Sequence, residues 1–264
     1  MEEKIAGTMD RGLQKSMFAR SMLLQSCWSS QGMQNLGFLF AIEPLLKRFL
    51  SDEESLRASS RRHLEYFNTH PYMAGFILGA VGAMEEKRAG APEAERPKIE
   101  KRIREVKRAM ASGLAAIGDS FFWGNLRPAA AAAALLAWAL FGALGVPRPF
   151  LCAAVLYLAA LNVPALWARW RGLELGYRHQ ERLPEKLEEL NWQRAARRIR
   201  RVGLTAAGVL TALCVVVPPW GGSADPRGLV IFAAALALKA FGVSGIRIFA
   251  AAAGLCVAAS AAGI

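Results

Sequence analysis

Polar residues with hydrogen-bonding side chains lie beside apolar or aromatic stretches of this sequence. Asn68 opens an Asn-Thr-His-Pro turn, and Asp119 precedes an aromatic triplet that ends at Trp123. Gln34 and Asn35 open a further apolar segment. Amides donate and accept hydrogen bonds, carboxylates accept them, and an indole ring stacks on flat apolar surfaces. We therefore predict that these five residues contact a bound ligand.

Each of these residues also has a purely structural interpretation. Asp119 can cap a helix or pair with Arg127. The turn at Asn68 can simply end a helix, because Pro71 disfavours helix in the residue before it. The two amides of the apolar segment can bond to neighbouring helices, and the indole can mark a membrane interface. The sequence leaves both interpretations open.

The sequence does not indicate independent catalysis. It shows no nucleophile arrangement, acid–base pair, metal cluster or phosphate-binding glycine loop. His63 lacks the acidic or hydroxyl-rich surroundings of a phosphorylated histidine. The cysteines are far apart and are interpreted as small buried apolar residues: Cys27, Cys152, Cys214 and Cys256. We expect no catalytic residue, no metal and no cofactor.

Composition points to a membrane. Of 264 residues 54% are hydrophobic, yet the formal net charge is +12. Charged residues are frequent in residues 1–128, whereas in 129–264 long apolar runs alternate with basic clusters. Because the basic residues flank apolar segments, we expect lipid contact and no nucleic-acid binding. The boundary predicts an amphipathic N-terminal region, 1–128, followed by a transmembrane region, 129–264.

The N-terminal region is expected to be helical throughout. Apolar residues recur at helical spacing over 34–50, and 55–67 has the pattern of a polar helix. Residues 72–84 are apolar but too short to cross a bilayer, so they are predicted to be buried or re-entrant. A basic helix is predicted over 95–116, ended by Gly118 and Asp119.

The C-terminal region is expected to cross the membrane about five times, since a span needs about 20 apolar residues. Apolar runs cover 129–146, 149–168 and 203–217, and two further helices are predicted in 228–264 with a turn between Lys239 and Arg247. The strongly basic segment 169–202 is predicted to be a cytoplasmic loop by the positive-inside rule. The N-terminus then lies inside and the C-terminus outside. The predicted fold class is an all-α polytopic membrane protein.

Three ordered stretches resemble a known family. The first stretch is Arg-Ser-Met-Leu-Leu-Gln-Ser-Cys-Trp at 20–28, followed by Met-Gln-Asn-Leu-Gly-Phe at 33–38. The second is His-Leu-Glu-Tyr-Phe-Asn-Thr-His-Pro at 63–71, followed by Met-Ala-Gly-Phe-Ile-Leu-Gly at 73–79. The third is Ile-Gly-Asp-Ser-Phe-Phe-Trp-Gly-Asn-Leu-Arg-Pro at 117–128. In this order they resemble enzyme IID of the mannose/fructose/sorbose family of the sugar phosphotransferase system (PTS).

The resemblance implies a non-catalytic subunit in the inner membrane of a bacterium. Such a subunit pairs with a IIC membrane subunit, in a multimer of IIC–IID pairs, to translocate a hexose-like sugar. Soluble IIA and IIB phosphocarriers supply the phosphate. The sequence departs from the family pattern in the basic helix predicted at 184–201 and in the short segment 218–226. These departures permit an alternative, a divergent IID protein with a regulatory or scaffolding role and no transport.

Overall fold

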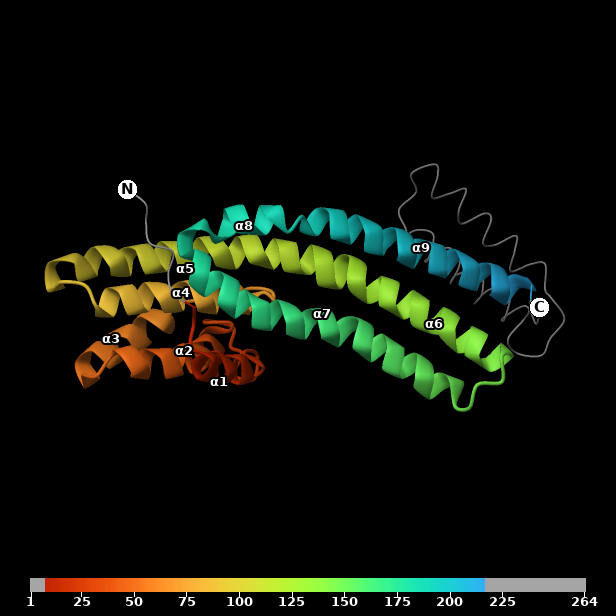
Figure 1. Ribbon diagram of the computed structural model, residues 1–264, viewed down its shortest axis with the longest axis horizontal. Helices are drawn as coiled ribbons and strands as arrows, with labels where there is room; N and C mark the ends of the chain where they lie inside the picture. Colours follow the sequence, from red (N-terminus) through yellow and green to blue (C-terminus); the bar gives the residue numbers. More distant parts are fainter. Residues whose placement is uncertain (1–7, 217–264) are drawn as a thin grey trace. The chain divides into compact units, whose positions relative to one another are not determined.

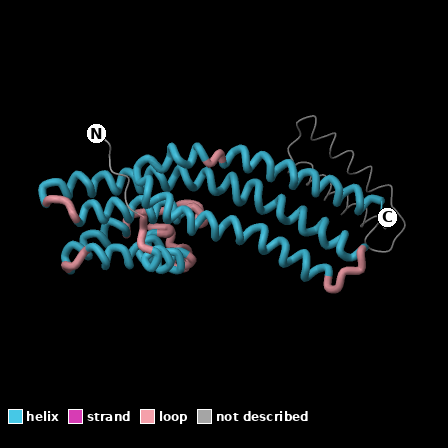
Figure 2. Tube along the Cα trace, viewed as in Figure 1, coloured by secondary structure: helices cyan, strands magenta, loops and turns pink. Residues whose placement is uncertain are grey.

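The structure, a computed structural model, describes residues 8–216 of the chain. Helices joined by short turns make up this part, which contains isolated β-bridges but no strand (Figure 2). The all-α expectation is confirmed for these residues. The two spans predicted in 228–264, with Lys239 and Arg247 between them, lie outside the described residues.

Short helices begin the chain: α1 (Arg11–Ser21), α2 (Asn35–Phe49), α3 (Glu53–His63) and α4 (Ala74–Ala89). Aspartates begin two of them, because Asp10 accepts from the amide of Leu13 at 3.3 Å and Asp52 from that of Ser55 at 2.7 Å. Such caps satisfy amides that the first helical turn leaves without partners. The polar helix predicted over 55–67 is therefore α3, which begins earlier, at Glu53, and ends earlier, at His63.

Helix α4 is buried on nearly every side and packs along a later helix, α7 (Pro149–His179). Glycines make this close contact possible. A β-carbon at Gly79 would lie 2.1 Å from the carbonyl oxygen of Leu173, and one at Gly176 would lie 2.0 Å from that of Phe76. The short apolar segment is therefore buried in protein, one of the two outcomes predicted for it.

A continuous helical stretch follows: the 3₁₀ turn η1 (Glu93–Glu95), α5 (Arg96–Gly118), the π-helix η2 (Asp119–Leu126) and α6 (Arg127–Ala143). The α-helix ends at Gly118, as predicted, but the chain stays helical because a π-helix begins at Asp119. Gly118 is needed because the ring of His70 packs against it, where a β-carbon would lie 2.4 Å from Cγ of His70. The helical stretch continues as the wider π-helix η2, and such π-helical segments are often found at functional sites.

Helix α6 turns through 144–148 into α7, and the two run side by side (Figure 1). Arg148, with a φ of 53°, ends this turn as predicted from its flanking prolines. The chain continues through η3 (Gln180–Arg182), α8 (Leu183–Glu189) and α9 (Trp192–Val216). The basic segment 169–202 is therefore almost wholly helical, and Asn191, with a φ of 48°, divides the single basic helix predicted there.

Two helical stretches, 93–143 and 149–211, are long and apolar enough to cross a membrane. Large apolar side chains lie exposed along α6 and α7, among them Trp138, Leu158 and Val163. Such surfaces suit lipid or another membrane protein. Cys152 belongs to this exposed surface and Cys27 is exposed in a turn, so the expectation that both are buried is wrong.

Candidate functional site

The Asn-Thr-His-Pro turn between α3 and α4 is held firmly by Gln34. The Gln34 amide donates to the carbonyl of Thr69 at 2.9 Å and accepts from the amide of Thr69 at 3.1 Å. Asn35 donates its side-chain amide to the carbonyl of Leu64 at 2.6 Å. Two neighbouring side chains thus replace the hydrogen bonds that a helix would have given this segment.

Helix α5 holds the other side of the turn. The hydroxyl of Thr69 donates to the carbonyl of Ala111 at 3.0 Å. The ammonium of Lys107 donates to the carbonyl of His63 at 3.1 Å and lies 4.4 Å from the ring centre of Phe38. The turn is therefore fixed between α2 and α5 and is not a flexible linker.

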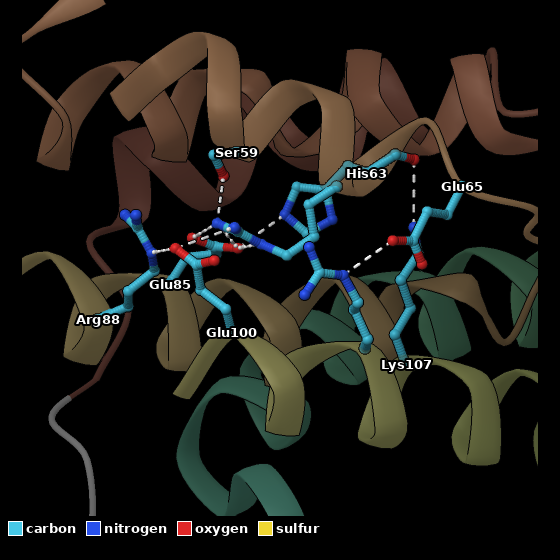
Figure 3. A network of polar contacts seen from close by, with 9 residues as sticks. Ser59, His63, Glu65, Glu85, Arg88, Glu100 and Lys107 are labelled. Carbon is cyan, nitrogen blue, oxygen red and sulfur yellow. Dashed lines mark hydrogen bonds and ion pairs between the residues drawn. The ribbon is translucent and has the colours of Figure 1, made fainter. Parts of the chain in front are cut away.

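A buried ionic network joins α3 to α4 and α5 beside this turn (Figure 3). Glu85 accepts two hydrogen bonds of 2.9 Å from Arg62 and lies 3.0 Å from Nε2 of His63. Glu100 lies 2.6 Å from Arg88 and 3.3 Å from Arg62. Arginine and carboxylate groups alternate through the network, so that each buried charge has a partner.

Burial and pairing act in opposite directions on this network. Burial alone would raise the pKa of Glu85, but the contacts with His63 and Arg62 outweigh it and lower that pKa to about 2. Burial lowers the pKa of His63, against the opposing effect of Glu85. His63 is therefore neutral at pH 7 and donates Nε2–H to the ionised Glu85. This bonding gives His63 a structural role, as the sequence favoured.

Asn68 lines a pocket of about 370 Å³. Tyr66, Lys107, Arg108 and Ser112 line the same pocket. Asn68 and Tyr66 are both exposed there. Of the five residues predicted to bind substrate, Asn68 is thus the one that lines this pocket.

Asp119 and Trp123 gather instead around His70. The His70 ring stacks on Phe122, with ring centres 5.1 Å apart, and lies 5.2 Å from the ring of Trp123. Burial lowers the pKa of His70 to about 4, against the opposing charge of Asp119. Nδ1 accepts from the amide of Tyr72 at 3.3 Å, so the proton of the neutral ring is on Nε2. This buried Nε2–H has no acceptor in the described part of the chain.

The structural alternatives for these residues can be compared with the geometry. Asp119 lies within a continuous helical stretch, and the guanidinium of Arg127 lies over the ring of Trp123, 5.3 Å from its centre. Asp119 and Trp123 are both exposed. His70, which joins them, was missed among the candidates. Its place beside Asn68 and before a proline was the only signal in the sequence.

The described residues contain no cluster of histidine, cysteine or acidic side chains that could hold a metal ion. The arrangement offers hydrogen-bond donors, one free carboxylate and aromatic faces. These groups can form hydrogen bonds and stacking contacts with a ligand.

A family model described as PTS system mannose/fructose/sorbose family IID component matches residues 8–219. The chain belongs to this family. The three stretches that carried the resemblance come together in the fold: 33–38 supplies Gln34, 63–71 supplies the turn, and 117–128 supplies the π-helix. The IID motifs thus form one structural unit around residues 68–70.

Named relatives agree with this assignment. The mannose-specific EIID component of Escherichia coli strain K12 is 35% identical over 180 residues, which cover 67% of this chain and 57% of that protein. The sorbose-specific EIID component of Klebsiella pneumoniae is 31% identical over 195 residues, 74% of this chain and 67% of that protein. The chain therefore spans little more than half the length of the Escherichia coli relative.

Solved structures give the same fold. A chain of the mannose transporter ManYZ in complex with microcin E492 is 25% identical and superimposes with a TM-score of 0.55, covering 97% of this chain and 98% of that one. A second chain, described as a membrane protein, is 24% identical with a TM-score of 0.67 and covers 99% of both. This IID component is accordingly a membrane protein of the PTS.

Proposed function

We propose that this IID component translocates a hexose-like sugar together with a IIC subunit, while IIA and IIB supply the phosphate. One observation carries the proposal: the buried Nε2–H of His70 has no acceptor, and it lies beside the carboxylate-bearing Asp119 segment and the exposed ring of Trp123. A sugar offers hydroxyl acceptors for such a donor and an apolar face for such a ring.

The proposed substrate contacts divide into two kinds. Asn68, Asp119 and Trp123 are exposed and can reach a ligand directly. The amides of Gln34 and Asn35 are engaged by the turn, so they act by fixing its backbone. Both kinds belong to the substrate-binding group proposed from the sequence.

The proposed topology has about five spans, a cytoplasmic N-terminus and an external C-terminus, with the basic segment 169–202 in the cytoplasm. We propose that the complex is a multimer of IIC–IID pairs. The exposed apolar faces of α6 and α7 support a membrane partner, because lipid and a packed helix both favour such faces.

The test is co-purification of the tagged chain from native membranes in mild detergent, followed by thermal unfolding with mannose, fructose, sorbose or no sugar. Recovery of a IIC protein and stabilisation by one sugar would support translocation and identify the substrate class. Recovery of the chain without IIC, with the same melting temperature in every sugar, would overturn translocation and favour the regulatory or scaffolding role.

A further inference from the structure

The pocket that Asn68 lines, here called the Lys107 pocket, has a buried lysine, Lys107, in its lining. Lys107 is only 4% exposed. Its ammonium donates one hydrogen bond, to the carbonyl of His63, and otherwise faces the rings of Phe38 and Phe67 at 4.4 and 5.3 Å from their centres. No carboxylate forms an ion pair with Lys107 in the described part of the chain. A buried charge in this condition is costly.

The surroundings of Lys107 are also positive. Arg104 and Arg108, on the same helix, share a single carboxylate, that of Glu65, at 2.8 and 3.0 Å. The charges of Glu65 and Glu85 both act on Lys107, but Glu85 is already paired with Arg62, so the basic groups still outnumber the carboxylates here. None of the residues that line the Lys107 pocket is acidic. An anion entering the pocket would therefore meet an excess of positive charge.

The other lining groups suit an anion with several oxygens. Arg108 offers a guanidinium, Asn68 an amide, and Ser112 and Tyr66 hydroxyls, and all four residues line the same pocket as Lys107. Phosphoryl oxygens accept several charge-assisted hydrogen bonds at once. At about 370 Å³ the pocket falls within the size range of small-molecule sites.

We propose that the Lys107 pocket binds the phosphoryl group of a small phosphate ester. Lys107 and Arg108 hold the phosphoryl oxygens, while Asn68 and Tyr66 contact the rest of the molecule. The same chemistry is presented by a hexose phosphate in solution and by the headgroup of an anionic phospholipid. The choice of a hexose phosphate as ligand rests on the proposed function. The phosphoryl site itself does not, because the excess positive charge at the pocket would attract inorganic phosphate equally.

The experiment is calorimetric titration of the full chain in a detergent with an uncharged headgroup. The probes are mannose 6-phosphate, inorganic phosphate, short-chain phosphatidylglycerol and unphosphorylated mannose.

Ser112→Asp places a negative charge at the exposed rim of the pocket, and Ser112→Asn is its neutral control of equal size. Arg108→Gln removes a lining cation, and Arg102→Gln, which removes an arginine of α5 paired with Glu181, is its control. Lys107→Met removes the buried cation, provided that its melting curve shows a folded chain.

Saturable binding of mannose 6-phosphate and inorganic phosphate supports a soluble ligand, if Ser112→Asp and Arg108→Gln each weaken it about tenfold or more while the controls stay within about twofold. Binding of phosphatidylglycerol alone, with the same pattern of variants, supports the phosphoryl site and assigns it to a lipid. Absence of saturable binding, equal effects of Ser112→Asp and Ser112→Asn, or mannose binding as tightly as its phosphate ester overturns the proposal. Inorganic phosphate contains no sugar, so its result does not depend on the proposed transport.

Discussion

Arg62 and Glu85 meet through two parallel hydrogen bonds of 2.9 Å, and their side chains are only 2% and 1% exposed. The pair joins the last turn of α3 to the second half of α4, and the Asn-Thr-His-Pro turn lies in the segment between these two helices. Charged groups removed from water to this extent are stable only while both partners are present. The position of the turn thus depends on an ionic contact outside it.

Removing either member of this pair should destabilise the fold strongly. Glu85→Gln or Arg62→Met should each lower the free energy of unfolding by about 3 kcal/mol, the lower end for a broken buried ion pair, because Arg62 keeps Glu100 at 3.3 Å and Glu85 keeps His63 at 3.0 Å. The double variant Arg62→Met with Glu85→Gln should lose less than the sum of the two. Denaturant titration in detergent measures all three.

The matched control for this cycle is the exposed pair of Arg57 and Glu53, 2.6 Å apart with side chains 71% and 77% exposed. Glu53→Gln should change the free energy of unfolding by no more than about 0.5 kcal/mol. Equal effects of Glu53→Gln and Glu85→Gln would contradict the structural importance of the buried pair.

Acid should destabilise the chain through His70 and Glu85. The folded-state pKa of His70 is lowered from 6.5 to about 4, so between these values the unfolded state binds more protons and stability falls as the pH falls. Glu85, lowered from 4.5 to about 2, adds a second loss that begins near pH 4.5. Melting temperature measured from pH 7 to pH 4 should decline, and His70→Gln should make the decline above pH 4.5 shallower without abolishing it, because His63, whose pKa is also lowered by burial, contributes in the same range. An unchanged slope in His70→Gln would contradict burial of a neutral ring.

Much of the helical architecture follows from the sequence, because apolar runs and their flanking charges are local signals. The runs at 129–146 and 149–168 correspond to α6 and the first part of α7, and the prolines around Arg148 mark the turn between them. Helix α2 likewise follows from its apolar periodicity. Tertiary contacts were not needed to recognise these elements.

The errors arise where a glycine or a polar residue serves a distant contact. Gly118 was interpreted only as a helix end, yet the chain stays helical beyond it, and it is a glycine because His70, far away in the sequence, occupies the place of its side chain. Gln34 carries no local signal that it bonds to Thr69. The pairing of Lys107 with a carbonyl, and not with a carboxylate, is also invisible in the sequence. Such relationships depend on the packed fold.

Glycines of the α4–α7 contact should be intolerant of substitution. In Gly79→Ala the new methyl group would meet the carbonyl oxygen of Leu173, a backbone atom that cannot rotate away, so α4 and α7 must separate. The expected loss is about 3 kcal/mol or more. In Gly113→Ala nothing lies within 4 Å of the added carbon, and the helix should gain about 0.5–1 kcal/mol. Thermal unfolding of both variants in detergent tests the contrast, and a folded, stable Gly79→Ala protein would contradict the packing.

The ring of Trp123 provides the sharpest test of the proposed sugar site. Trp123 is 42% exposed beside His70, whereas Trp138, on the apolar surface of α6, is 46% exposed. Substitution of either tryptophan by alanine removes a ring of similar exposure, so effects on insertion and folding should be alike. Only Trp123→Ala should lower sugar uptake, by about tenfold, because a ring–sugar stacking contact of about 1.4 kcal/mol is lost. Uptake is measured in cells that supply the IIC, IIA and IIB partners, with the membrane content of each variant determined by immunoblot. Equal uptake by the two variants would show that Trp123 is an interfacial residue and would remove it from the substrate site.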